Sequence, residues 1–239
     1  MTLALFDLDN TLLANDSDYL WGEYLCNRKI VDPVDYDRQN KHFYQQYERG
    51  EMDIDEFLRF ALEPLRQHSP SELLTLRDDY LASLLPAQVA PGTAALLQQH
   101  HERGDTLVII TATNRFISAP IARYLGVNHL IATLPSLTDG NFDGGYRSPP
   151  CYQQDKLTNL NLWLATYGLN RNGSYAYSDS HNDLPLLEWA DHPVAVDPDP
   201  QLRAVAEERN WPVISLRQGQ FTAPLSTANP MDKTPPNTP

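Results

Sequence analysis

The stretch that most constrains the fold is an apolar run near the N-terminus that ends abruptly in acidic residues, LALFDLDNTLL at positions 3–13. A short, nearly continuous apolar run predicts a strand that is buried on both faces, as in a parallel sheet. Alternation along such a strand would place Asp7 and Asp9 on one face, about 7 Å apart along the chain. Two close carboxylates raise each other's pKa unless a cation lies between them. The run therefore indicates either a reactive or metal-binding pair or a solvated acidic turn, and alone it does not separate the two.

Charge and composition exclude several classes of partner. The chain has 18 Lys and Arg against 31 Asp and Glu, a formal net charge of −13, so we expect neither nucleic-acid nor membrane binding. Any anion site must then be local. Cys26 and Cys151 fit no metal-ligand spacing and are expected to be reduced thiols. No apolar run approaches the roughly 20 residues of a membrane span, and we expect a cytoplasmic protein.

The order of predicted elements indicates an α/β fold with an insertion. Residues 15–86 show only helical patterns, which is too long for a simple crossover and predicts an inserted helical cap. From residue 87 onward, helices alternate with short apolar strands, which is typical of a parallel, Rossmann-like sheet, and a turn-rich stretch at 138–145 predicts a small hairpin. We therefore predict a core of residues 1–14 and 87–218, a cap of residues 15–86, and disorder in the Pro-, Thr- and Asn-rich tail at 219–239.

Polar residues follow several of the predicted strands. Thr111 and Thr113 come after the apolar run at 106–110, the sequence SDSHND follows another at positions 178–183, and Asp197 follows a further one. Ligands of parallel sheets bind beyond the carboxyl ends of the strands. This convergence favours a functional site at that edge over a solvated acidic turn.

These residues resemble the motifs of the haloacid dehalogenase superfamily of phosphohydrolases. The sequence DLDNT at positions 7–11 resembles the first motif, Thr111 the second, Lys156 the third, and Asp179 with Asp183 the fourth. The resemblance covers residues 1 to about 215. It implies a Rossmann-like core, and the helical insertion resembles the C1 cap of the phosphoserine phosphatase-like branch.

The resemblance also implies roles for particular residues. Asp7 would attack phosphorus and form an aspartyl-phosphate, and Asp9 would protonate the leaving group and then deprotonate water. The transferring oxygens would be bound by Thr111, Ala112 and Lys156.

A magnesium ion is implied by the same resemblance. Mg²⁺ prefers hard oxygen ligands, which the Asp7 carboxylate, the Asp9 carbonyl and Asp179 would supply. Asp183 would hold a metal-bound water or orient Lys156, and Asn182 would support it.

Some side chains have a purely structural alternative. Without the context of the other motifs, Thr111 would be interpreted as a structural hydroxyl at the end of a strand, and Lys156 as a solvated charge at the start of a helix. His181 could act as a base, but Asp9 already fills that role, and the other six histidines, with His100 and His101 among them, are expected at the surface. The aromatic residues of the insertion are expected in its core, with a minority lining the substrate pocket: Trp21, Tyr24, Phe43, Tyr44 and Tyr47.

The insertion would select the substrate. Asp16 falls where phosphoserine phosphatases carry an acidic cap residue and could receive an ammonium group, whereas Arg59 and Arg66 lie out of register with the arginine that binds a substrate carboxylate. The opening motif is similar to a bacterial subgroup that includes histidinol-phosphate phosphatases. We therefore expect an amino alcohol phosphate such as histidinol phosphate.

Three functions remain open from the sequence. The first is a Mg²⁺-dependent phosphomonoesterase acting on a small phosphorylated metabolite, with a phosphoserine phosphatase-like hydrolase as a variant. The second is a phosphotransferase that uses the same aspartyl-phosphate. The third, a non-catalytic binding protein, is least favoured because every catalytic position holds a competent residue. The chain is expected to be a monomer or a homodimer.

Overall fold

The computed structural model describes residues 2–218, so the disorder predicted for residues 219–239 lies outside the described residues. Along the chain the elements are β1 (Leu3–Phe6), η1 (Leu8–Leu12), α1 (Ser17–Asn27), α2 (Pro33–Arg49), α3 (Ile54–Gln67), α4 (Pro70–Leu84), α5 (Thr93–Glu102), β2 (Thr106–Thr111), α6 (Arg115–Tyr124), β3 (His129–Ala132), β4 (Leu134–Thr138), β5 (Asn141–Arg147), α7 (Gln154–Tyr167), β6 (Tyr175–Ser178), η2 (His181–Asp183), α8 (Leu184–Trp189), β7 (His192–Val196), α9 (Pro200–Glu208) and β8 (Val213–Ile214). Strands and helices alternate from α5 onward, as predicted.

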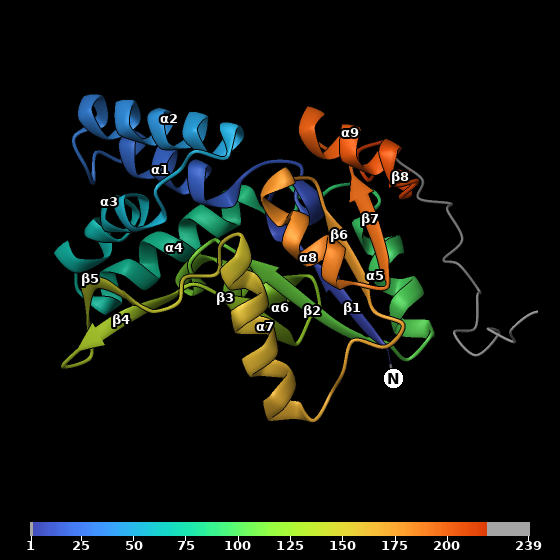
Figure 1. The fold of residues 1–239 in the computed structure, drawn as a ribbon. Helices are drawn as coiled ribbons and strands as arrows, with labels where there is room; N and C mark the ends of the chain where they lie inside the picture. Colours follow the sequence, from blue (N-terminus) through green and yellow to red (C-terminus); the bar gives the residue numbers. More distant parts are fainter. Residues whose placement is uncertain (1, 219–239) are drawn as a thin grey trace, which may run out of the picture.

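Within residues 2–218, six strands form one sheet in the order β3-β2-β1-β6-β7-β8, and every neighbouring pair is parallel. The first apolar run therefore becomes a central strand, β1, with β2 on one side and β6 on the other. Its side chains alternate between two cores, because a buried parallel strand is covered on both faces. Ala4 and Phe6 pack with α5 and α6, whereas Leu3 and Leu5 pack with α7, α8 and α9. Figure 1 shows these helices on opposite sides of the sheet.

Helices α1 to α4 occupy the insertion between β1 and α5, and no strand of the sheet lies within residues 15–86, all of which the structure describes. Each of the four helices begins at a residue whose side chain caps it, namely Asp16, Asp32, Asp53 and Ser69. The chain enters and leaves the insertion through adjacent segments, because Ala14 N donates to Gln88 O at 2.7 Å and Ala90 N to Leu12 O at 3.0 Å. Helices α1 to α4 are called the cap helices below; the exact domain boundaries stay a prediction.

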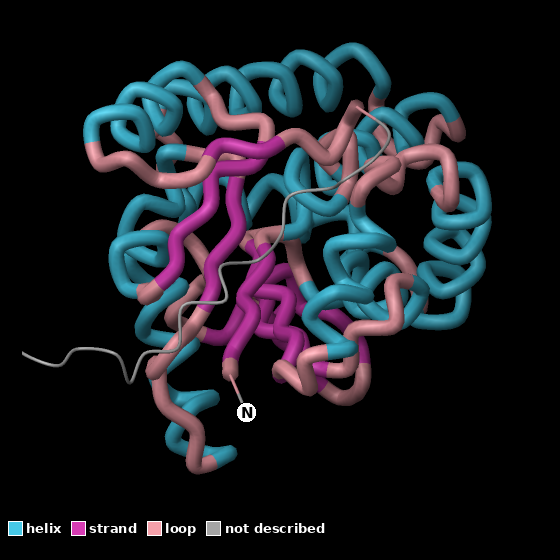
Figure 2. The backbone as a smooth tube through the Cα atoms, turned by 90° about the vertical axis from the view of Figure 1, so that its right-hand side faces the viewer, coloured by secondary structure: helices cyan, strands magenta, loops and turns pink. Residues whose placement is uncertain are grey.

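The hairpin predicted around residues 138–145 forms from β4 and β5, which pair antiparallel. It stands apart from the main sheet and runs beside the cap helices (Figure 2). The Tyr146 hydroxyl of β5 donates to the Asp55 carboxylate of α3. The hairpin thus packs against the insertion, a long-range contact that local sequence patterns do not reveal.

The expectation of a surface His100 is wrong. His100 lies on α5 and is fully buried, with Nδ1 at 2.8 Å from Asp105 Oδ2 and Nε2 at 2.9 Å from the Tyr177 hydroxyl. Burial lowers its pKa, although Asp105 opposes this. The neighbouring His101 is exposed as expected, because successive residues on a helix point in different directions.

No helix within residues 2–218 is long and apolar enough to cross a membrane.

Candidate active site

The chain turns sharply where β1 ends. Asp7 N still donates to Tyr177 O at 2.9 Å, but the strand ends at Phe6 and the next residues form a helical turn in which Asn10 has a φ of 57°. The expectation that Asp7 and Asp9 share one strand face is therefore wrong. The turn directs the two carboxylates to different neighbours, which gives them different chemical environments.

Asp7 is paired with a buried lysine. Its Oδ1 accepts from Lys156 Nζ at 2.8 Å and its Oδ2 from the Thr11 hydroxyl at 3.3 Å, and the residue is 5% exposed. Burial raises the pKa of Asp7 to about 7; the charge of Lys156 lowers it, and the carboxylates of Asp183 and Asp9 add to the increase. With this pKa the Asp7 carboxyl ionises near neutral pH, and Lys156 is the cation beside it.

Lys156 lies in the first turn of α7 and bridges two acids. Its Nζ also donates to Asp183 Oδ2 at 2.7 Å, and that oxygen accepts from the Ser178 hydroxyl at 2.8 Å. Burial alone would lower the pKa of Lys156, but the charges of Asp183 and Asp7 raise it above its ordinary value. The ammonium group is therefore fixed in its charged form between β1 and the loop after β6, so of the two roles predicted for Asp183 the geometry fits orientation of Lys156.

Asp179 joins the same cluster through Thr11. The Thr11 hydroxyl lies 2.9 Å from Asp179 Oδ1 and accepts from Asp179 N at 3.1 Å, while it also faces Asp7. Burial and the charge of Asp7 raise the pKa of Asp179 well above its usual range. The Thr11 hydroxyl thus links Asp7 of the first motif to Asp179 of the fourth by hydrogen bonds.

This cluster fits a divalent cation. Asp7, Asp179 and Asp183 are all buried, and Lys156 supplies a single compensating charge, which leaves an excess of negative charge that burial makes costly. No group of three or more His, Cys, Asp or Glu side chains in metal-binding geometry occurs within residues 2–218. Mg²⁺ does not need one, since it keeps several waters and takes only one or two carboxylates from a protein. Asp7 and Asp179 meet that smaller requirement.

Asp9 is held by hydroxyl and amide groups and has none of the partners of Asp7. Its Oδ1 accepts from Ser17 N at 2.7 Å and Ser17 Oγ at 2.6 Å, and its Oδ2 accepts from Thr113 Oγ1 at 2.6 Å. The Thr111 hydroxyl lies 3.4 Å from the same Oδ2 and accepts from Thr113 N at 3.1 Å. Ser17 begins α1, so a cap helix fixes the orientation of Asp9.

A pocket joins these groups to the cap helices. Its lining includes the predicted residues Asp7, Asp9, Asp16, Thr111, Ala112, Lys156, Asn182 and Asp183, together with Asp18, Tyr19, Asn40, Phe43, Tyr44, Tyr47, Met52, Phe57, Thr113 and Tyr152. Asp179 is not among the lining residues, but the Thr11 hydroxyl links it to Asp7, which is. The structure therefore brings the predicted residues together, all of them lining one pocket except Asp179, which joins the cluster through Thr11.

The cap side of this pocket is acidic and aromatic. Asp16 caps α1 by accepting from Asp18 N and Tyr19 N through Oδ1, both at 2.9 Å, and Asp18 accepts from Asn114 Nδ2 at 3.1 Å. Burial and the charge of Asp9 raise the pKa of Asp16 well above its usual range and that of Asp18 to about 7. Among the described residues that line the pocket none is an arginine, and the one basic side chain is Lys156.

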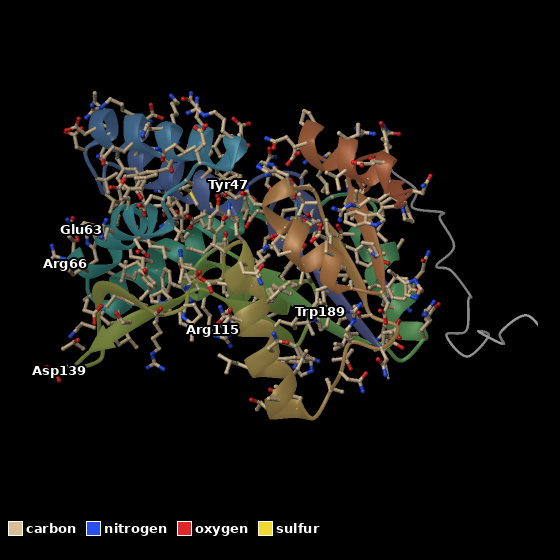
Figure 3. The ribbon with its side chains drawn as sticks, in the orientation of Figure 1. Tyr47, Glu63, Arg66, Arg115, Asp139 and Trp189 are labelled. Atoms are coloured by element: carbon tan, nitrogen blue, oxygen red, sulfur yellow. The ribbon has the colours of Figure 1, made fainter. Side chains whose placement is uncertain are left out.

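The two arginines considered in the sequence lie elsewhere. Arg66 pairs with Glu63, with Nε at 2.9 Å from Oε2, and Arg59 lines a separate groove between α2 and α3. Figure 3 shows Arg66 and Glu63 at the far end of the cap from Tyr47. The expectation that they do not reach the site agrees with this placement.

Several site residues were given no definite role from the sequence. Ser17 and Thr11 are small polar residues whose partners become visible only when the turn after β1 is known. Of the aromatic residues of the insertion, Phe43, Tyr44 and Tyr47 line the pocket, and helical periodicity alone could not choose them because both cores and pockets are apolar. His181 does not act on the cluster: its Nδ1 lies 2.8 Å from Asp199 Oδ2.

Comparison with known proteins agrees with this geometry. A family model for haloacid dehalogenase-like hydrolases matches residues 4–188. A histidinol-phosphatase of Neisseria meningitidis is 41% identical over 219 residues, which cover 90% of this chain and 99% of that protein. A phosphoserine phosphatase of Mycobacterium tuberculosis is 30% identical over 217 residues, which cover 90% of this chain and 70% of that protein.

Solved structures match as well. A protein of unknown function from Bordetella pertussis Tohama I superimposes with a TM-score of 0.84 at 40% identity and covers 90% of this chain and 100% of its own. A phospho-aspartyl intermediate analogue of phosphoserine phosphatase superimposes with a TM-score of 0.68 at 17% identity, covering 92% of this chain and 94% of its own, which supports the fold. The predictions of the family, of the α/β fold and of a phosphatase are confirmed. The chain belongs to the haloacid dehalogenase-like hydrolases.

Proposed function

We propose that this protein is a Mg²⁺-dependent phosphomonoesterase that hydrolyses an amino alcohol phosphate, of which histidinol phosphate is the best candidate, through an aspartyl-phosphate on Asp7. The observation that carries the proposal is a pocket with a lysine-paired carboxylate at its base and two further carboxylates, Asp16 and Asp18, on its cap side, with no arginine among the described residues that line it.

The base of the pocket supports nucleophilic catalysis. A carboxylate attacks phosphorus only when it is ionised, and Lys156 at 2.8 Å favours the ionised form of Asp7. Attack forms an Asp7–phosphorus bond and breaks the bond to the substrate alkoxide, so that one difficult displacement becomes two easier ones. The Lys156 ammonium also has a remaining N–H that donates to the transferring phosphoryl oxygens. A fixed positive charge stabilises the transition state most effectively at those oxygens.

Asp9 is placed to move the proton. The alkoxide that leaves needs a proton, and the water that later attacks the aspartyl-phosphate must lose one. Four donors orient the Asp9 carboxylate: Ser17 N, Ser17 Oγ, Thr113 Oγ1 and, at a longer distance, Thr111 Oγ1. Because the Lys156 ammonium is bonded to Asp7 and Asp183 and not to Asp9, Asp9 is left to exchange a proton in both half-reactions.

A magnesium ion would be held by the Asp7 carboxylate, the Asp9 carbonyl and Asp179. When bound, it supplies positive charge that offsets the buried carboxylates and the transferring phosphoryl group. The protein's part is to bring the carboxylates of Asp7 and Asp179 together, which the shared Thr11 hydroxyl does.

The cap side of the pocket supports a cationic substrate. A phosphorylated amino acid carries a carboxylate, which needs a cationic partner when it is desolvated, and Lys156 is already bound by Asp7 and Asp183. An amine would instead meet Asp16 and Asp18, and a planar cationic ring could also stack on aromatic residues such as Tyr44. The name of the Neisseria meningitidis relative supports the same substrate.

A second candidate is a phosphoserine phosphatase, which the name of the Mycobacterium tuberculosis relative favours. A phosphotransferase with the same aspartyl-phosphate is a third, distinguished by acceptor alcohols that outcompete water.

The test is a phosphatase panel measured with Mg²⁺ and again with excess chelator. Histidinol phosphate should give the highest kcat/KM, phosphoserine a value lower by about 100-fold because a carboxylate would face Asp16 and Asp18, and chelation should abolish turnover. Asp16→Asn should lower kcat/KM for histidinol phosphate far more than kcat/KM for p-nitrophenyl phosphate. Arg66→Ala should change kcat/KM for neither substrate. Preference for phosphoserine would contradict the substrate assignment, and turnover that survives chelation would contradict the metal.

A further inference from the structure

A close contact joins the cap helices to the core beside the pocket. There the C-terminal end of α2 meets the loop after β6, and Asn182 Nδ2 donates to Tyr47 O at 3.0 Å. Three residues further along, Gly50 ends α2 and lies against the ring of His181. Figures 1 and 3 show this end of α2, with Tyr47, directed at the core beside α8.

The His181 ring is fixed from the core side. Asp199 Oδ2 accepts from His181 N at 2.7 Å and lies 2.8 Å from Nδ1, while Asp199 Oδ1 caps α9 by accepting from Gln201 N and Leu202 N. The opposite ring atom, Nε2, is buried and has no hydrogen-bond partner within residues 2–218. The ring therefore cannot swing away from α2 without losing its bond to Asp199.

Gly50 satisfies two requirements at one position. Its φ is +70°, the left-handed conformation that closes a helix, with its N–H bonded to the carbonyls of Gln46 and Tyr47. A Cβ added at Gly50 would lie 2.6 Å from His181 Nε2. A residue with a side chain would thus be strained by its backbone and would also collide with the ring.

The contact fixes a wall of the pocket. Tyr47 lies one turn before Gly50, lines the pocket, and packs at 6.3 Å from the ring of Tyr152. Tyr44, on the preceding turn, lines it too. A shift of the α2 end away from His181 would carry both aromatic side chains with it, since a helix moves as a rigid element.

We propose that His181 is a positioning residue: held by Asp199, its ring is the surface against which Gly50 packs, and this contact sets the position of the pocket wall that carries Tyr44 and Tyr47. His181 acts through α2 and does not touch the reacting atoms. The effect on catalysis rests on the proposed function, in which this pocket binds the substrate.

The test is a double-mutant cycle of Gly50→Ala and His181→Ala. Gly50→Ala should displace α2 and raise KM about tenfold with a smaller change in kcat, a size in the usual range for coupled contacting residues. In the His181→Ala background the methyl group has room, so Gly50→Ala should raise KM by no more than about twofold. An equal increase in both backgrounds would overturn the proposal.

A matched glycine separates collision from backbone strain. Gly168 ends α7 with a φ of +65°, and a Cβ there would meet nothing within 4 Å. Gly168→Ala should lower stability as much as the backbone strain at Gly50 does, with KM unchanged. A rise in KM for Gly168→Ala equal to that for Gly50→Ala would overturn the role of the contact.

Hydrogen exchange gives a second reading that does not depend on activity. In the free protein, the amides of the last turn of α2, Gly50 N–H and Glu51 N–H, should exchange faster in Gly50→Ala and return toward the wild-type rate when His181→Ala is added. Unchanged exchange in Gly50→Ala would overturn the proposal. Restored exchange in a protein that lacks phosphatase activity altogether would leave the contact intact and refute the proposed function alone.

Discussion

Ser17 donates two hydrogen bonds to one oxygen of Asp9, from its backbone nitrogen at 2.7 Å and from its hydroxyl at 2.6 Å. Asp9 follows the central strand of the core, whereas Ser17 is the first residue of the first cap helix. The carboxylate proposed to move protons is therefore oriented by the element that also shapes the substrate pocket.

Ser17→Ala keeps the backbone donor and removes the hydroxyl. A hydrogen bond to a charged group contributes about 1.5–3 kcal/mol, so kcat for an alkyl phosphate should fall by about tenfold or more. With p-nitrophenyl phosphate, whose leaving group needs little protonation, the loss should be smaller. Equal losses for the two substrates in steady-state assays would contradict a role for Ser17 in proton transfer.

Lys156 forms ion pairs with two buried carboxylates at once. Lys156→Met should lower kcat/KM by about 100- to 1,000-fold, the usual effect of removing one charge-stabilising group. It should also reduce the free energy of unfolding by about 3–5 kcal/mol, because it leaves Asp7 and Asp183 unpaired.

Addition of Asp183→Asn separates the two effects of this lysine. The double variant Lys156→Met with Asp183→Asn should regain part of the stability, measured by urea unfolding, since one buried charge is removed. It should regain no activity. Recovery of activity without the lysine would show that Lys156 serves the fold only.

Asp18 gives a pH-dependent prediction with a definite sign. Burial and the charge of Asp9 raise its pKa from 3.8 to about 7, so the folded protein binds a proton there more tightly than the unfolded chain does. The stabilisation from this proton is present below pH 3.8 and is lost as the pH rises through about 7. Asp18→Asn should accordingly gain in melting temperature relative to wild type between pH 5 and pH 8.

The same substitution should weaken substrate binding, because an amide no longer attracts an amine. For wild type, KM for histidinol phosphate should fall as Asp18 ionises near neutral pH, and for Asp18→Asn this part of the profile should be flat. A variant that loses stability at pH 8, or whose KM profile matches wild type, would contradict the assignment.

The first apolar run and the alternation after residue 87 were sufficient to predict the sheet and the site edge, because burial on both faces leaves an unmistakable pattern and parallel strands end at a common edge. Asp7, Asp179 and Asp183 follow strands of that sheet and were predictable for the same reason, whereas Lys156 begins a helix and was assigned only from its resemblance to the third motif. Asp16 was expected to face the substrate from the insertion, and the structure adds that it lines the pocket while its side chain also caps α1.

Other features depend on contacts between distant segments. The packing of the hairpin on α3, the approach of Gly50 to His181 and the bonds from Ser17 and Thr113 to Asp9 join residues with no shared local pattern. The relation between Asp7 and Asp9 was mistaken because β1 ends at Phe6 and the chain turns directly after Asp7, so that strand alternation does not extend to Asp9.

The burial of His100 also depends on contacts between distant segments, which local sequence patterns do not predict. These contacts offer a test by stability measurements. The His100 ring connects Asp105 to the Tyr177 hydroxyl inside the core, so His100→Leu should cost about 1–3 kcal/mol by leaving that hydroxyl unsatisfied and Asp105 with Arg103 as its partner. Addition of Tyr177→Phe should cost less in that background than in wild type, as measured by denaturant unfolding. Fully additive losses would contradict the hydrogen-bonded pair.

The central claim is that phosphorus passes through Asp7. Acid quenching of the enzyme during turnover of substrate with a radiolabelled phosphoryl group, followed by peptide mapping, tests it most directly. The account predicts a label on the peptide that contains Asp7, released by hydroxylamine as expected for an acyl phosphate, and no label in Asp7→Asn. Turnover with no enzyme-bound label, together with inversion of configuration at phosphorus, would contradict it.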